Sequence, residues 1–274
     1  GTAPLGGTRP FVLTIHDLQF LTHPDYLSPS KLRYLSSVVP RSVRAASVVA
    51  VPTDYVRRTV VDAYGPDPSR VIVVPHGVEP TLGADARAED ELRQRYGLGG
   101  GRVIVFPAIT HPHKGHRFLL DVMAQRWNDP DLRLVLLGGI GTADGDVIEA
   151  IATLGLADRV VRAGRVPDAD RDGLIALADA LVFPSEYEGF GAPVVEAMAL
   201  GTPVICSDQP ALAEVVGDAG LVLPADLDAW ADALDIAGER APELIAAGRR
   251  RAGAFSAARS GEGLATAYRR ALER

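Results

Sequence analysis

Residues 180–208, ALVFPSEYEGFGAPVVEAMALGTPVICSD, contain the pattern that decides the fold. The run Ala180–Pro184 is continuously apolar, as is typical of a strand buried on both faces of a parallel sheet. Pro193 suits the first turn of a helix, and Gly201 ends that helix. A second apolar run, Pro203–Cys206, follows directly. This stretch therefore predicts a strand, a helix and a second strand parallel to the first.

The same alternation runs along the whole chain. Apolar runs predict nine strands: Phe11–His16, Val48–Pro52, Val71–Pro75, Val103–Pro107, Leu132–Leu137, Val160–Ala163, Ala180–Pro184, Pro203–Cys206 and Leu221–Leu223. Helix-length stretches lie between or after them: Ser30–Ala46, Tyr55–Tyr64, Ala88–Tyr96, His116–Arg126, Gly145–Leu154, Asp168–Leu177, Pro193–Leu200, Ala211–Val216 and Leu227–Ala237, with two more helices in Arg240–Arg274. This order predicts an α/β fold with doubly wound parallel sheets.

Polar and glycine-rich segments at Gly83–Asp90 and Gly97–Gly101 indicate a domain boundary. We expect a first Rossmann-like domain over residues 1–82, a second over residues 83–252, and a C-terminal helix over residues 253–274 that packs back on the first. Only three predicted strands precede the boundary. Because three strands make a thin sheet, we expect the opening part of the first domain to be missing from this chain.

The composition excludes several classes of protein. The chain has 274 residues, of which 47% are hydrophobic, and a formal charge of −7, so neither a disordered chain nor a nucleic-acid-binding protein is expected. No apolar run is long enough for a transmembrane helix, and the opening GTAPLGGTRP lacks the apolar core of a signal peptide. The single cysteine, Cys206, cannot form an internal disulfide. A cytoplasmic protein is expected.

Ligands of open parallel sheets bind beyond the carboxyl ends of the strands, where the loop SEYEGFG follows one predicted strand. Gly189 and Gly191 leave backbone amides uncovered before the helix at Pro193, and such a helix start attracts phosphate. Glu188 and Glu196 lie eight residues apart and can accept hydrogen bonds from hydroxyl groups on either side of a phosphate. On spacing alone, two carboxylates that merely favour the helix dipole and solvent fit equally well.

Lys114 follows another strand and is one of only two lysines in the chain. Its ammonium can reach a diphosphate, although a solvated loop lysine fits as well. Histidines 111, 113 and 116 surround it, but no cysteine or carboxylate cluster completes a metal site, and no metal is expected. The turn Gly138–Gly141 is either a ligand contact or simply a tight turn. His16 ends the first strand and either faces a cleft or is an ordinary loop or core histidine.

The motifs, taken in order, resemble a known family. TIHDL, VIVVPHGVE, FPAITHPHKGH, LVLLGG, VVRAGRVPD, ALADALVFPSEYEGFG and PALAEVVGDAGLVLP span Phe11 to about Leu234. EGFGAPVVE is similar to the E-x7-E signature of retaining GT-B glycosyltransferases of family 4. The resemblance implies two Rossmann-like domains facing a cleft, with the acceptor on the first and the nucleotide sugar mostly on the second.

The resemblance also implies roles for individual residues. Glu188 would hold donor-sugar hydroxyls, Glu196 would hold the ribose, and Lys114 would neutralise the diphosphate. His16 would lie near the sugar. The resemblance implies further contacts with the donor from Arg165, Val166, Gly189, Phe190, Gly191 and Ala192. A contact from Gly138 is expected because it lies in the glycine turn. Many members have an arginine where this chain has Ile109, and His113 or Arg117 are candidates for the missing charge.

The expected reaction is retaining, metal-independent transfer of a hexose, of mannose or glucose type, from a GDP- or UDP-hexose to a hydroxyl of a sugar, lipid-linked or small-molecule acceptor, with no cofactor. Lys31, Arg33, Arg41 and Arg44 form a basic helix region that is either a solvated face or a peripheral membrane contact. Two alternatives remain: a truncated, non-catalytic nucleotide-binding module and a non-hydrolysing nucleotide-sugar epimerase. The sequence does not indicate an oligomeric state.

Overall fold

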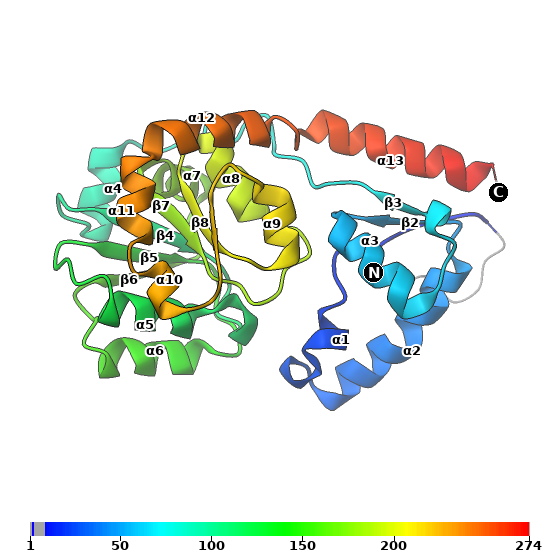
Figure 1. The fold of residues 1–274 in the computed structure, drawn as a ribbon, viewed down its shortest axis with the longest axis horizontal. Coiled ribbons are helices and arrows are strands. Elements are labelled where there is room, and N and C mark those ends of the chain that lie inside the picture. Colours follow the sequence, from blue (N-terminus) through cyan, green and yellow to red (C-terminus); the bar gives the residue numbers. More distant parts are fainter. Residues whose placement is uncertain (1, 3–8, 274) are drawn as a thin grey trace.

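The computed structural model describes residue 2 and residues 9–273, so most of the GTAPLGGTRP segment lies outside the described residues. Two parallel sheets form separate bodies (Figure 1). The smaller sheet has the order β1-β2-β3, from Val12–Thr14, Val48–Val51 and Val71–Val73. The larger has the order β6-β5-β4-β7-β8-β9, from β4 (Val103–Pro107), β5 (Arg133–Leu137), β6 (Val160–Gly164), β7 (Ala180–Phe183), β8 (Val204–Ser207) and β9 (Leu221–Leu223).

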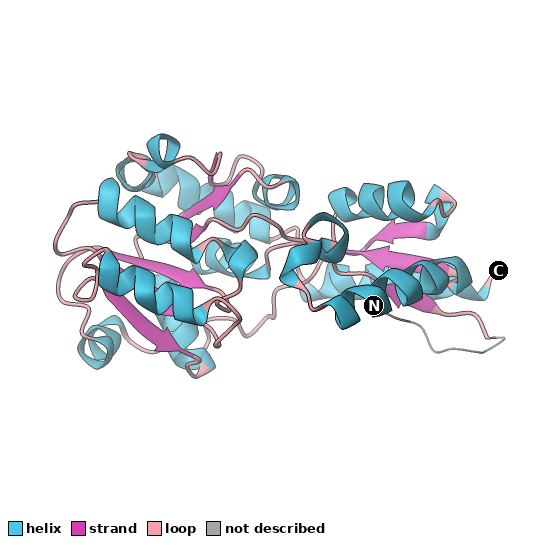
Figure 2. Cartoon of the chain, turned by 90° about the horizontal axis from the view of Figure 1, so that it is seen from below, coloured by secondary structure: helices cyan, strands magenta, loops and turns pink. Residues whose placement is uncertain are grey.

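Helices cover both sheets (Figure 2). They are α1 (Gln19–Thr22), α2 (Pro29–Ala45), α3 (Asp54–Tyr64), α4 (Glu89–Tyr96), α5 (His116–Gln125), α6 (Asp144–Thr153), α7 (Asp168–Leu177), α8 (Ala192–Leu200), α9 (Pro210–Val216), α10 (Leu227–Trp230), α11 (Ala233–Glu239), α12 (Ala241–Ala252) and α13 (Ala257–Leu272). We call β1–β3 with α1–α3 the small unit, and the six-stranded sheet with α4–α12 the large unit.

The strand order of the large unit places the site. The chain winds outward from β4 to β6, returns to the centre at β7, and winds outward again to β9. Right-handed crossovers therefore put α5 and α6 on one face and α7 and α8 on the other, as Figure 1 shows. The winding direction reverses between β4 and β7, and a crevice opens beyond the carboxyl ends of strands at such a point. The predicted doubly wound α/β fold is confirmed.

One predicted helix is wrong. Leu227–Ala237 does not form one helix but breaks between α10 and α11. The indole Nε1 of Trp127 donates hydrogen bonds to the carbonyl oxygens of Trp230 and Ala231. The chain turns there to bury Trp230 completely in the core. Tertiary packing thus overrides a pattern that looks continuous in the sequence.

The chain's last helices connect the two units. Gly248 of α12 lies against Met198 of α8 in the large unit. Ala267 and Ala271 of α13 are buried against Val48 of the small unit's central strand. Small side chains on α13 allow this close approach to the sheet. The division at residues 82 and 252 remains a prediction, and the packing of α13 is the observation that supports it.

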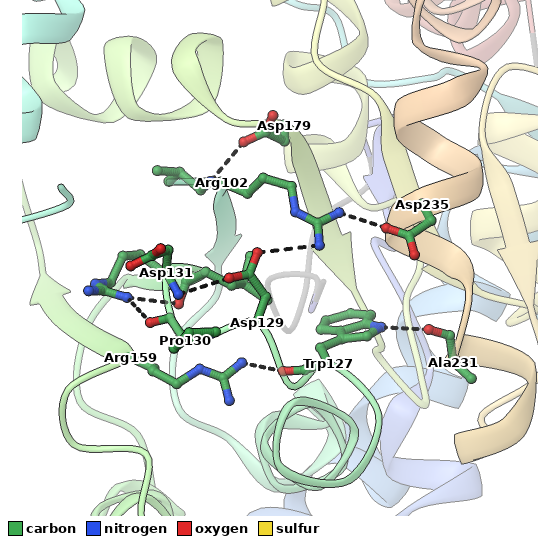
Figure 3. Close-up of polar contacts among 12 residues, drawn as sticks. Arg102, Trp127, Asp129, Pro130, Asp131, Arg159, Asp179, Ala231 and Asp235 are labelled. Carbon is green, nitrogen blue, oxygen red and sulfur yellow. Dashed lines mark hydrogen bonds and ion pairs between the residues drawn. The ribbon is translucent and has the colours of Figure 1, made fainter. Parts of the chain in front are cut away.

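A polar network anchors the amino edge of the large sheet (Figure 3). Arg102, just before β4, donates to Asp129 and to Asp235 of α11, at 3.5 and 2.8 Å. The Asp179 carboxylate accepts the Val103 N–H at 2.7 Å. These contacts bind β4 to its neighbours at the end opposite the crevice. They stabilise the sheet without reaching the candidate site.

A second polar cluster joins α7 to α4. The Asp170 side chain is fully buried and accepts hydrogen bonds from Arg87, Arg95 and the Tyr96 hydroxyl at 2.6–2.7 Å. Burial opposes its ionisation, but the hydrogen bonds from these three groups outweigh burial and lower the pKa of the carboxyl to about 2. The charged carboxylate therefore stabilises the fold above its ordinary pKa, and that contribution is lost as the pH falls from about 4 toward 2.

We expect Asp170→Ala to lower the free energy of unfolding by about 3 kcal/mol at pH 7, since it leaves two arginines without their buried partner. Urea denaturation at pH 7 and pH 3 measures the loss, which should shrink at the lower pH. The matched control is Asp168→Ala, whose side chain on the same helix is 86% exposed. Equal losses for the two variants would contradict this account of Asp170.

Candidate functional site

The two loops that flank the crevice carry opposite charges and meet. Lys114 lies in the loop after β4, and Glu188 lies in the loop after β7. The Lys114 Nζ donates to the Glu188 Oε1 at 2.6 Å, and the side chains are only 19% and 12% exposed. The ammonium also lies 5.7 Å from the centre of the Phe183 ring. Each charge is thus neutralised by the other in a largely enclosed position.

A glycine allows the β4 loop to approach β7 so closely. Gly115 has a φ of +76°, and a Cβ atom there would clash with the carbonyl oxygen of Pro184. The turn Pro112–Lys114 and the start of α5 at His116 therefore pack directly on the end of β7. This approach brings Lys114 within reach of Glu188.

Two histidines next to Lys114, His113 and His116, add no positive charge at neutral pH. Burial, followed by the charge of Lys114, lowers the pKa of His113 to about 3 and that of His116 to about 4. Arg117 is exposed and pairs with Asp121 at 3.0 Å on its own helix. Neither His113 nor Arg117 therefore replaces the arginine that the resemblance places at Ile109. Lys114 carries the positive charge of this loop.

Helix α8 starts directly after the buried segment Gly189–Gly191, and Ala192 at its first position is exposed. Gly191 is its N-cap with a φ of +86°, and no side chain caps the helix. Two hydrogen bonds hold the backbone of the loop just before α8. The Gln209 Nε2 donates to the Glu188 carbonyl oxygen at 3.1 Å, and the Thr53 Oγ1 donates to the Gly189 carbonyl oxygen at 2.9 Å. Since Thr53 belongs to the small unit, both units hold this loop.

Glu196 lines a cavity of about 470 Å³ beside the same helix start. The cavity wall also includes Phe190, Ala192, Asp168 and Arg171, and its other side comes from residues 76–85, which connect the units. Burial raises the pKa of Glu196, and Arg171 partly offsets this effect. Glu188 and Lys114 do not line this cavity; Glu188 precedes the start of α8, whereas Glu196 lies within the helix.

His16 reaches the site from the small unit. A Cβ atom on Gly189 would clash with the His16 carbonyl oxygen, so the two backbones touch. The exposed His16 ring lies 3.3 Å, Nδ1 to Nε2, from His76, and the His76 ring packs edge-on against Phe190. His16 therefore lies beside the loop after β7, and its expected contact with the sugar stays a prediction.

The remaining predicted residues lie at the carboxyl ends of β5 and β6. The Gly138 N–H donates to the Gly164 carbonyl at 2.8 Å, and a Cβ on Gly138 would clash with the carbonyl oxygen of Ala108. The guanidinium of Arg165 lies against Gly139, and Val166 packs on the core. These residues border the crevice but do not line the cavity that contains Glu196.

Sequence reasoning missed several residues of this region. Asp168 and Arg171 lie on a helix whose charged residues look like an ordinary solvated face, yet both line the cavity. His76 was visible within the motif VIVVPHGVE, and its glycine and proline neighbours were a signal of a close backbone approach. Thr53 gave no signal, because its bond to Gly189 joins residues 136 positions apart.

The described residues contain neither a metal-binding cluster nor a membrane-spanning helix. Among residue 2 and residues 9–273, no group of three or more histidine, cysteine or carboxylate side chains is placed to hold a metal ion. Within the same ranges, every helix is too short or too polar to span a bilayer.

Two family models match the chain. The model "Glycosyl transferases group 1" matches residues 88–248, and "Glycosyltransferase Family 4" matches residues 2–82. The chain belongs to the group 1 glycosyl transferases. The group 1 match contains Lys114, Glu188 and Glu196, and the family 4 match contains His16 and Thr53.

Curated relatives of this family extend beyond the chain. It is 33% identical over 226 residues to O-antigen chain mannosyltransferase B of Escherichia coli, a match that covers 80% of this chain and 58% of the relative. It is 32% identical over 255 residues to D-inositol 3-phosphate glycosyltransferase of Kineococcus radiotolerans, covering 84% of this chain and 59% of that one. The chain therefore spans less than two thirds of the length of either relative.

Solved structures show the same fold. HepE of Anabaena, in complex with UDP and glucose, superposes with a TM-score of 0.81 at 23% identity, covering 95% of this chain and 72% of that one. Sucrose-phosphate synthase of Thermosynechococcus elongatus gives 0.78 at 22% identity, with coverage of 94% and 67%. The predicted GT-B arrangement of two Rossmann-like sheets is confirmed.

We expect Gly189→Ala to force the small unit and the β7 loop apart, because the added methyl meets the backbone of His16. Differential scanning calorimetry should show a lower melting temperature, equivalent to about 2 kcal/mol. Gly145→Ala is the control, since it adds a methyl to α6 with no atom within 4 Å and should be neutral or stabilising. A Gly189→Ala protein as stable as wild type would show that the backbones do not touch.

Proposed function

We propose that this chain binds a nucleotide diphosphate sugar at the crevice of its large unit and transfers the hexose to an acceptor hydroxyl. The observation that carries the proposal is the Lys114–Glu188 pair, which lies beside the uncapped start of α8 at the point where the sheet reverses. A lone ammonium and bare amides suit a diphosphate, and an adjacent carboxylate suits sugar hydroxyls.

The nucleoside is proposed to occupy the cavity that contains Glu196. A carboxylate can accept hydrogen bonds from both ribose hydroxyls, and burial increases the strength of such bonds. Phe190 and Arg171 supply an apolar face and a positive charge in the same wall. Arg165 and Val166 border the crevice where the base would extend. Either UDP or GDP fits this chemistry. HepE, which has the same fold, was solved in complex with UDP and glucose.

The diphosphate is proposed to bind between this cavity and Glu188. Ala192 is exposed at the start of α8 and lines the cavity, and its N–H would donate to the diphosphate there. Lys114 would exchange Glu188 for the diphosphate, and the freed Glu188 carboxylate would accept hydrogen bonds from the sugar. In the structure each group neutralises the other, which spares the protein an unpaired buried charge.

The chemical step breaks the bond between C1 of the hexose and the diphosphate oxygen. Negative charge develops on the departing oxygen, where Lys114 and the amides at Gly191 and Ala192 would stabilise it without a metal. The acceptor oxygen bonds to C1 on the same face, its proton passes to the departing diphosphate, and the configuration at C1 is retained. Glu188 positions the sugar, and His16 would contact it from the small unit.

Replacing the lysine tests the proposal. For Lys114→Ala we expect turnover of UDP-glucose or GDP-mannose to fall at least a hundredfold, equivalent to about 3 kcal/mol of transition-state stabilisation. Release of nucleoside diphosphate in the presence of a panel of acceptors measures it. Lys31→Ala removes the only other lysine, which is exposed on α2, and should leave turnover unchanged.

Near-normal turnover of the Lys114→Ala protein would refute the assignment of Lys114. Release of nucleoside diphosphate without any acceptor would instead favour the epimerase alternative. Calorimetric binding of nucleotide with no turnover by the full-length protein would support a binding module.

For Glu196→Ala we expect the dissociation constants of UDP and GDP to rise about tenfold, because the ribose loses its acceptor. Isothermal titration calorimetry measures both nucleotides. The control is Glu262→Ala, which removes an exposed carboxylate from α13. Unchanged binding by Glu196→Ala would rule out the ribose role.

A further inference from the structure

Helix α3 of the small unit begins against α9 of the large unit. The first N–H groups of a helix have no partners within the helix. At α3, the Thr53 hydroxyl accepts the Val56 N–H at 3.2 Å, as an ordinary N-cap does. The acceptor for the Asp54 and Tyr55 N–H groups is a side chain 160 and 159 residues further along the chain. The Glu214 carboxylate of α9 accepts them through Oε1 and Oε2, at 2.7 and 2.9 Å.

Glu214 itself is held firmly. The guanidinium of Arg251 on α12 donates to the carbonyl oxygens of Glu214 and Val215, at 2.6 and 2.8 Å. Arg251 also lies over the ring of Phe255, 5.1 Å from its centre. The end of α9 is therefore fixed to the large unit, and the carboxylate is presented to α3 from a rigid support.

The start of α3 also holds the loop of the candidate site. The Thr53 hydroxyl accepts one bond from its own helix and donates its proton to the Gly189 carbonyl. At the other end of α9, the side chain of Gln209 caps the helix and donates to the Glu188 carbonyl. The carbonyl of Glu188 is thus held by the large unit and that of Gly189 by the small unit. Helix α9 takes part in both contacts, through Gln209 at its start and through Glu214, which caps α3.

From this geometry we infer that Glu214 is a positioning residue that locks the small unit onto the large one. By capping α3 it fixes Thr53, and through Thr53 it fixes the carbonyl of Gly189 next to Glu188. A negative charge at a helix start is also favoured by the helix dipole. The contact between Glu214 of α9 and the start of α3 does not depend on the proposed function. Only the expected effect of Glu214 on turnover rests on that function.

Hydrogen exchange of the Asp54 and Tyr55 amides tests the lock directly. In Glu214→Ala we expect these two amides to exchange at least tenfold faster, because they lose their only acceptor. Glu214→Gln keeps one carbonyl oxygen and should give an intermediate change. Glu243→Ala is the matched control, since Glu243 pairs with Arg240 inside the large unit. Unchanged exchange in Glu214→Ala, or an equal change in the control, would overturn the inference.

The consequence for the site is tested on the same full-length variants. Turnover should fall about tenfold in Glu214→Ala while the dissociation constant of UDP or GDP changes less than twofold, and Glu214→Gln should recover part of the turnover. Because Glu214 acts through Thr53, the Glu214→Ala/Thr53→Val double variant should lose no more turnover than Thr53→Val alone. Additive losses, or a loss confined to nucleotide binding, would contradict a positioning role.

The two readouts separate the inference from the proposed function. Faster exchange at Asp54 and Tyr55 in Glu214→Ala, together with a wild-type protein that transfers no sugar, would leave the lock standing and refute the transferase proposal. Normal exchange in an active Glu214→Ala protein would do the reverse. If Glu214→Ala fails to fold, Glu214→Gln supplies the same comparison with a smaller perturbation.

Discussion

The reversal of winding between β4 and β7 is the constraint on which the site depends. Parallel strands with right-handed crossovers send the loops after these two strands to one edge, with no helix between them. One loop carries Lys114 and the other carries Glu188, so the topology brings an ammonium and a carboxylate to the same edge of the sheet. Glycines at positions 115 and 189 then allow backbone contacts that any side chain would block. Charge and close approach together define the crevice.

The small unit contributes position more than chemistry. Its strands place His16 and Thr53 at the edge that faces the β7 loop, and both contact Gly189. Helix α13, although last in the chain, packs on this unit through small side chains and keeps it attached. The site is therefore supported from both sheets, which suits the proposed transfer between two bound substrates.

Much of the fold was predictable because its signals are local. Continuous apolar runs marked the strands, and Pro193 with Gly201 marked the bounds of α8 to within one residue. The position of Lys114 and of the β7 loop beyond the carboxyl ends of strands was also predicted, but the ion pair between Lys114 and Glu188 was not. The break before α11 was not, because it depends on the distant indole of Trp127. Arg171 and Thr53 were missed for the same reason: their partners are set by tertiary packing.

The most direct measurement is a crystal structure of the protein soaked with UDP or GDP. The account predicts a diphosphate that accepts from the Lys114 ammonium and from the first amides of α8, with the ribose against Glu196. It also predicts that Lys114 has released Glu188. A nucleotide bound elsewhere on the chain, with the Lys114–Glu188 pair intact, would contradict it.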